Sequence, residues 1–222
     1  MKPNRLMAMG AAAVLWAVAA TGQVVTNNFD IAVNQAVPDG NWNGLASSAN
    51  LGGMSGVVTN VSVTLNLSGG DNGDLYAYLV HDTGFAVLLN RVGLSSSNSV
   101  GYADPGMTSV IFSDAAAGDI HFYGGNGGAA LTGEFQPDGR TVNPGTTPAV
   151  NYDAAARGAM LSSFEGAAPD GTWVLYLADL SGGAQSTLTS WNLEVVTIPE
   201  PATWALLLFG GSLALMTLRR RG

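Results

Sequence analysis

Hydrophobic and polar residues alternate most regularly between Val57 and Leu67. Val61, Val63, Leu65 and Leu67 are apolar, and the residues between them are Ser, Thr or Asn. A period of two is typical of a β-strand that buries one face and exposes the other. The pattern therefore predicts a strand over this segment.

Short apolar segments bounded by Gly, Pro, Asn, Asp or Ser predict further strands along the chain. They cover residues 29–33, 74–80, 85–89, 109–112, 120–123, 172–179 and 187–196. We expect 29–33 to be an edge strand, and 74–80 and 172–179 to be central strands buried on both faces. Residues 85–89 should form a hairpin with the strand before them. Between 93 and 157 we otherwise expect long loops, followed by one helical turn within 155–164. Because no stretch between residues 23 and 198 keeps a helical period, the predicted fold class is all-β.

The N-terminus has a different pattern. Lys2 and Arg5 precede an apolar stretch over 6–19, and small residues occupy 17–20. This order is that of a secretory signal peptide, with cleavage expected between Ala19 and Gln23. We assign residues 1–22 to this signal.

The C-terminus contains three parts in order. Pro199, Glu200 and Pro201 are followed by an apolar run over 202–218 and then by Arg219, Arg220 and Arg221. As a helix the run would span ~25 Å, slightly less than the ~30 Å hydrocarbon core of a membrane. The arginines would stay on the cytoplasmic side.

This tail resembles the PEP-CTERM sorting signal of exported bacterial proteins. The resemblance implies a transmembrane helix, an exosortase-type processing protease as partner, and delivery to the cell surface or an extracellular polysaccharide matrix. The alternative is an ordinary single-pass anchor, which explains the apolar run and the arginines but not the Pro-Glu-Pro motif. The sorting signal is assigned to residues 199–222 and the mature domain to residues 23–198.

Charge and cysteine content narrow the functions open to the mature domain. The chain has 16 acidic and 8 basic residues; setting aside Glu200 and the five basic residues of the two ends leaves 15 and 3, a net charge of −12. Such a surface repels nucleic acids and anionic membranes, which excludes them as partners of the domain. The absence of cysteine excludes disulfides, thiolate metal sites and cysteine nucleophiles.

Two stretches carry a second resemblance. The sequence Asn-Gly-Asp-Leu-Tyr occupies 72–76, Pro-Asp-Gly-Thr-Trp occupies 169–173, and Ser-Trp-Asn-Leu occupies 190–193. In this order they resemble the P domain (P/Homo B domain) of subtilisin-like proprotein convertases. The resemblance implies a jelly-roll β-sandwich and covers about residues 57–196, with a weakly matching middle.

Few residues suit catalysis. His81 and His121 are the only histidines, and no Gly-x-Ser-x-Gly motif occurs. Glu134, Glu165 and Glu194 are the only glutamates of the mature domain, which gives little support to a carboxylate-pair glycosidase. We therefore predict that the protein is not an enzyme.

Calcium is the metal that the sequence favours. Asp71 and Asp74 lie in a glycine-containing loop, and Ca²⁺ is bound by carboxylate and carbonyl oxygens. P-domain relatives can bind calcium, and the resemblance makes Asp74 and Asp179 candidate ligands. The competing interpretation is that Asp71 and Asp74 only shape a turn.

The sequence thus predicts an exported β-sandwich with a structural, adhesive or interaction role, stabilised by Ca²⁺. Two alternatives stay open. One is a carbohydrate-binding module in which Trp42, Tyr102 or Tyr123 stacks on sugar rings, so that extracellular polysaccharide is a candidate partner. The other is a hydrolase of unrecognised type.

Overall fold

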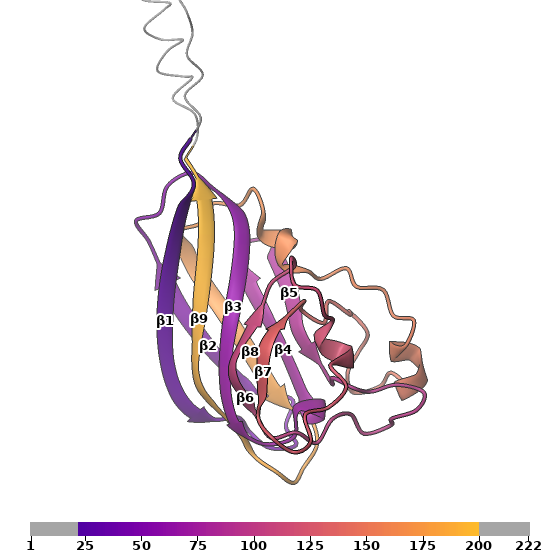
Figure 1. Ribbon diagram of the computed structural model, residues 1–222. Coiled ribbons are helices and arrows are strands. Elements are labelled where there is room, and N and C mark those ends of the chain that lie inside the picture. Colours follow the sequence, from indigo (N-terminus) through magenta and orange to yellow (C-terminus); the bar gives the residue numbers. More distant parts are fainter. Residues whose placement is uncertain (1–21, 200–222) are drawn as a thin grey trace, which may run out of the picture. The chain divides into compact units, whose positions relative to one another are not determined.

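The protein is described by a computed structural model over residues 22–199, which form two β-sheets packed face to face (Figure 1). The all-β prediction is therefore confirmed. Apart from Gly22 and Pro199, the predicted signal peptide and sorting signal lie outside the described residues, and with them Glu200, Pro201 and Arg219 to Arg221. Within the described range, no helix is long and apolar enough to span a membrane.

The strands divide five and four between the sheets. The first sheet has the order β1-β9-β3-β6-β7 and contains β1 (Val25–Ala36), β3 (Val57–Gly69), β6 (Met107–Phe112), β7 (Leu131–Phe135) and β9 (Ser186–Ile198). The second has the order β2-β8-β4-β5 and contains β2 (Leu45–Leu51), β4 (Leu75–His81), β5 (Gly84–Asn90) and β8 (Gly171–Asp179). Four short 3-10 helices lie in the connections: η1 (Asn72–Asp74), η2 (Ile120–Phe122), η3 (Ala149–Tyr152) and η4 (Leu161–Phe164). All neighbouring strands are antiparallel except β6 and β7.

The core lies between the two sheets. The alternation read in β3 places Val61, Val63 and Leu65 in it, fully buried. Trp173 of β8 and Trp191 of β9 are its largest side chains. Each buried indole N–H has an acceptor, as a buried polar group requires: Trp173 donates to a backbone carbonyl and Trp191 to a serine hydroxyl.

Most predicted strands are present. β1 is an edge strand, β4 and β8 are interior, and β4 and β5 form a hairpin. The helical turn expected within 155–164 is η4, and residues 144–148 lie in a loop.

Four details were wrong or missed. Residues 120–122 form η2 rather than a strand, because the side chain of Asp119 accepts the backbone N–H of His121 and caps a helical turn. β4 and β8 bury mainly one face, and most of their outward residues are half-buried, although Thr172 is exposed and Ala178 is buried. β2 and β7 were not predicted, since one is rich in Ser, Ala and Asn and the other is short and contains Gly133.

A buried ionic network holds the loops between β5 and β8. The guanidinium of Arg140 forms ion pairs with Asp119 at 2.9 Å and Asp138 at 3.3 Å, and its Nε donates to the carbonyl of Tyr152. Its Cζ lies 5.0 Å from the ring centroid of Phe122. Only 4% of the Arg140 side chain is exposed. Arg140 therefore joins the loops that contain η2 and η3.

Candidate functional site

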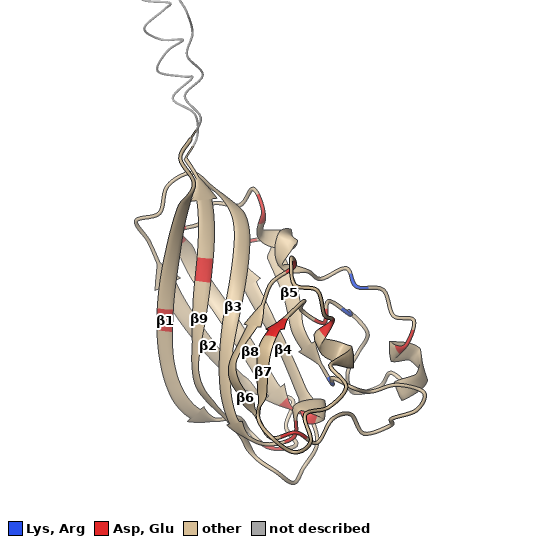
Figure 2. Ribbon diagram, viewed as in Figure 1, with Lys and Arg blue, Asp and Glu red and all other residues tan. Residues whose placement is uncertain are grey.

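Three connections meet at one end of the sandwich: the turn at residues 38–41, the loop at 70–74 and the loop at 180–185. Backbone hydrogen bonds join them, from Asn41 to the carbonyl of Asp179 and from Leu180 to the carbonyl of Asp74, each at 2.9 Å. The backbone N–H of Gly183 donates to the carboxylate of Asp39. Acidic residues gather in these loops (Figure 2). We call this region the acidic loop end.

Asp179 is the most unusual residue of the acidic loop end. It is fully buried, and neither carboxylate oxygen has a hydrogen-bond partner within residues 22–199. Burial raises its pKa to about 6, and repulsion from Asp74 and Asp39 adds to the increase. The backbone N–H groups of Ser181 and Ser186 oppose this increase, although neither makes a bond of normal geometry. An ionised carboxylate buried without a partner is costly, and either protonation or a bound cation would remove this cost.

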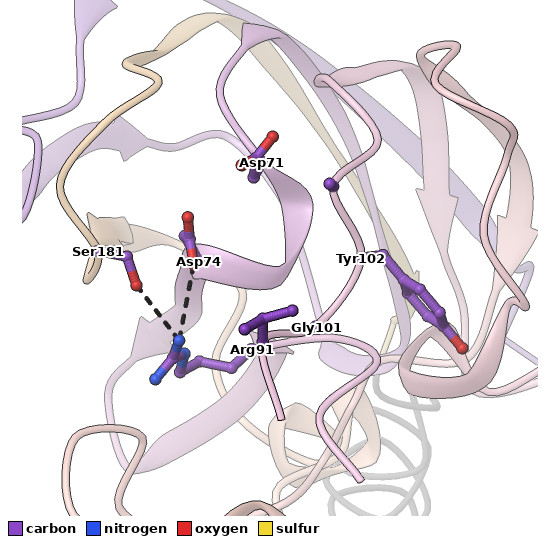
Figure 3. Close-up of a pocket in the computed structure, with 8 residues that line it drawn as sticks. Asp71, Asp74, Arg91, Gly101, Tyr102 and Ser181 are labelled. Carbon is purple, nitrogen blue, oxygen red and sulfur yellow. Dashed lines mark hydrogen bonds and ion pairs between the residues drawn. The ribbon is translucent and has the colours of Figure 1, made fainter. Parts of the chain in front are cut away.

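Asp74 lies beside Asp179 and is also perturbed. Its pKa is raised by burial and by the charges of Asp71 and Asp39, while the Ser181 side chain and Arg91 lower it. The Arg91 guanidinium is 3.6 Å from Asp74 and donates to the hydroxyl of Ser181 at 3.3 Å (Figure 3). One cation therefore faces a region that contains four carboxylates.

A second unpartnered oxygen comes from Asn72. Its side-chain NH₂ donates to the carbonyl of Gly106 at 3.1 Å and to the hydroxyl of Tyr123 at 3.4 Å, which fixes the amide orientation. The Oδ1 atom is buried and accepts no hydrogen bond from the described part of the chain. The loop 70–74 thus contributes a buried amide oxygen in addition to its carboxylates.

Other aspartates of the domain are used differently. Asp104 accepts the backbone N–H groups of Asn126 and Gly128, and Asp114 accepts those of Leu161 and Ser162. Asp170 accepts two N–H groups from residues 53 and 54. For these residues the interpretation as turn-forming aspartates is sufficient. It is not sufficient for Asp179.

The acidic loop end fits a hard cation in its donor types. Ca²⁺ takes six to eight oxygens from carboxylates, amides, backbone carbonyls and water. Asp179 and Asp74 would supply carboxylate oxygens, with Asp39 and Asp71 nearby. The amide of Asn72 instead contacts Gly106 and Tyr123. Residues 22–199 contain no cluster of three His, Cys, Asp or Glu side chains arranged for a metal, so backbone carbonyls and water would have to complete the shell.

Of the predicted metal residues, Asp74 and Asp179 share this region and Asp71 lies beside Asp74. Asp39 and Asn72 were not predicted. Asp39 had the sequence of an ordinary turn, and the role of Asn72 becomes visible only when its Oδ1 is found buried.

A hollow of about 240 Å³ opens beside these carboxylates. Asp71, Asp74, Arg91 and Ser181 line one part, and residues 100–103 line the other. In Figure 3 the ring of Tyr102 points away from the carboxylates. Small polar ligands can therefore reach Asp71 and Asp74 from solvent.

Neither histidine is available as a general base. His81 has Nδ1 3.1 Å from the carbonyl of Thr172 and Nε2 2.8 Å from that of Ala168. His121 has Nδ1 2.6 Å from Asp138 and Nε2 2.8 Å from the carbonyl of Leu94. Both rings are buried and all four nitrogens lie within hydrogen-bond distance of internal acceptors, so neither side chain is placed to meet a substrate.

The three aromatic residues proposed for sugar stacking do not form one surface. Tyr102 and Tyr123 pack on each other with ring centroids 4.4 Å apart, and the hydroxyl of Tyr123 donates to Asp104. These two rings mainly support the loops. Trp42 remains 52% exposed.

Comparison with known proteins does not identify a family for the chain. No family model matches the chain, and no curated protein matches it significantly. Among solved structures, a serine protease of Aeromonas sobria in complex with a chaperone is 16% identical, with a TM-score of 0.45 over 80% of this chain and 28% of that one. The same protease alone is 16% identical, with a TM-score of 0.43 over 79% and 27%. The chain spans less than a third of the length of these structures, and at this similarity neither bears on its activity.

Proposed function

We propose that the chain is an exported, non-catalytic β-sandwich protein of the jelly-roll P-domain type, with Ca²⁺ bound at the acidic loop end. Its role would be structural or adhesive, at the cell surface or in an extracellular polysaccharide matrix. The observation that carries the calcium part is Asp179, a fully buried carboxylate beside Asp74 and Asp39 that has no hydrogen-bond partner within residues 22–199.

Calcium would stabilise the domain by neutralising this repulsion. When bound, the ion supplies positive charge and coordination to oxygens that otherwise repel one another. Asp179 and Asp74 would hold it from two loops that are distant in sequence. Occupancy would therefore join the end of β8 to the loop after β3.

The non-catalytic part is supported by the two histidines. Both side chains are buried and both use their nitrogens for internal hydrogen bonds. The hydrolase alternative would need a different base, and no geometry within residues 22–199 favours one over the rest.

Export and sorting are supported by the sequences of the two ends. Intact-mass measurement of the protein from the cell envelope and from the medium tests this part. We expect the first residue to lie between Ala20 and Gln23 and the last to lie near Pro199 to Pro201. Recovery of protein that still contains Arg219 to Arg221 from every fraction would instead indicate a permanent anchor.

Calcium binding should depend on pH through Asp179. The pKa of this carboxyl is about 6 in the folded protein, against ~3.9 in an unfolded chain. Calcium binds the ionised form, so its affinity should be constant above pH ~7 and fall by up to about tenfold per unit below pH ~6. Titration calorimetry between pH 5 and 8 measures this dependence. An affinity independent of pH would exclude Asp179 as a ligand.

The raised pKa of Asp179 also makes the stability of the metal-free protein depend on pH. Because its folded-state pKa is raised, Asp179 favours the folded state most below pH ~4, and this contribution is lost as pH rises through ~6. In chelator, its contribution should therefore make the protein less stable at pH 7 than at pH 5.

A further inference from the structure

The strands of the four-stranded sheet place no charged side chain on its outer face. Strands β2, β4, β5 and β8 contain no Lys or Arg, and their one acidic residue, Asp179, is buried. The other sheet carries Asp30, Glu134 and Glu194 on its strands (Figure 2). In a domain with a net charge of −12, an uncharged sheet face is a local exception.

Aromatic rings cross this face. Tyr78 of β4 stacks on Tyr176 of β8, with centroids 4.7 Å apart and planes inclined by 19°. Its ring also lies 5.3 Å from Phe85 of β5 and 5.7 Å from Tyr76. The tyrosines are half-buried and Phe85 is 36% exposed. These four residues and Trp42 are called the aromatic face.

Trp42 extends the aromatic face beyond β8 and is held in place. The hydroxyl of Tyr176 donates to the carbonyl of Trp42. A Cβ on Gly145 would lie 2.0 Å from Cζ2 of the indole, so the ring packs directly on that glycine. The hydrogen bond fixes the backbone of Trp42 and Gly145 packs against its indole, so the ring should lose little conformational entropy on binding.

Neutral hydrogen-bonding groups lie further along β2 and β8 on the same face. Asn50 of β2 pairs with Thr172 of β8, Ser48 pairs with Val174, and all three polar residues are exposed. Sugar rings present C–H faces that pack on aromatic rings, and hydroxyls that pair with such groups. A polyanion would meet the negative field of the domain, and β2, β4, β5 and β8 offer it no Lys or Arg.

We propose that the aromatic face binds an uncharged polysaccharide chain. A second copy of the protein fits this face less well. A symmetric contact would place the polar residues of one copy against those of the other, and the face has no large aliphatic side chains. Stable dimer interfaces are more hydrophobic than this. Trp42 directly follows the turn at 38–41 of the acidic loop end, whereas the other four rings lie on the strands. None of the five rings is a calcium ligand, so we expect binding without Ca²⁺.

Affinity electrophoresis in gels that contain hydroxyethylcellulose, galactomannan or alginate tests the proposal. We expect at least one of the two neutral polymers to retard the protein. Chelator should not change this retardation, and neither should 0.5 M NaCl, which is about ten times the ~0.05 M of the running buffer, because no ion pair contributes to binding.

Trp42→Ala and Tyr78→Ala should each weaken binding of the polymer about tenfold or more, as expected for central aromatic anchors. Gly145→Val should weaken it by displacing the indole. Phe122→Ala, which removes a 47% exposed ring outside this face, is the control and should bind normally.

Three results would overturn the proposal. They are no retardation by either neutral polymer, binding of alginate alone, or a dimer in sedimentation that Trp42→Ala dissociates. Loss of polymer binding in chelator would indicate that the polymer binds at the acidic loop end instead. Failure of calcium binding alone, with retardation intact, would overturn the proposed metal site and leave this inference standing.

Discussion

Asp179→Asn is expected to raise the melting temperature of the protein in chelator at pH 7 and to abolish the stabilisation by calcium. The substitution removes a buried charge that repels Asp74 and Asp39 and that has no hydrogen-bond partner in the described part of the chain. Most substitutions of buried residues destabilise, so an increase in the absence of metal is a distinctive sign. In the wild type, calcium at ~100 times its Kd should add ~2.7 kcal/mol, or roughly 5–10 °C.

Asp170→Asn is the matched control for this prediction. Asp170 is also an aspartate at a loop, but its carboxylate accepts two backbone N–H groups. Its substitution should lower the melting temperature in chelator and leave the calcium response intact. If Asp179→Asn behaved in the same way, the carboxylate of Asp179 would be a structural acceptor and not a metal ligand.

Arg140→Ala should destabilise the domain by ~3–5 kcal/mol, because it leaves Asp138 buried without its cation and Asp119 without its closest one. For a domain of this size the melting temperature should fall by roughly 10 °C. Thermal denaturation followed by circular dichroism measures the change, and chelator removes any contribution from calcium.

Arg157→Ala provides the comparison. Arg157 also faces Asp119, at 3.6 Å, but 26% of its side chain is exposed. We expect a loss of about 1–2 kcal/mol, mostly from its hydrogen bonds to the loop at 136–138. Equal effects of the two substitutions would show that burial does not determine the strength of this network.

The sequence predicted the strands whose residues alternate or form apolar runs. β3 and β9 are long, and their inward residues are Val, Leu and Trp, so their pattern is read directly. β2 was missed because its inward positions include Ser47, whose burial depends on the indole N–H of Trp191 donating to it. That contact links residues 144 positions apart and has no local signal.

The candidate site was predicted in part for a similar reason. Asp71 and Asp74 stand out as carboxylates in a glycine-containing loop, and the P-domain resemblance added Asp179. Nothing local distinguishes Asp179 from Asp170, because the difference lies in whether backbone N–H groups of other loops reach the carboxylate. The aromatic face was likewise hidden, since Tyr76, Tyr78 and Tyr176 read as ordinary strand residues.

Direct titration of the metal-free protein with CaCl₂ in a calorimeter tests the central claim. The account predicts one Ca²⁺ per chain and, at pH 6, release of a fraction of a proton that is absent in Asp179→Asn. Running the titration in two buffers of different ionisation enthalpy measures the proton release. No saturable heat for the wild type, or the same binding in Asp179→Asn, would contradict the account.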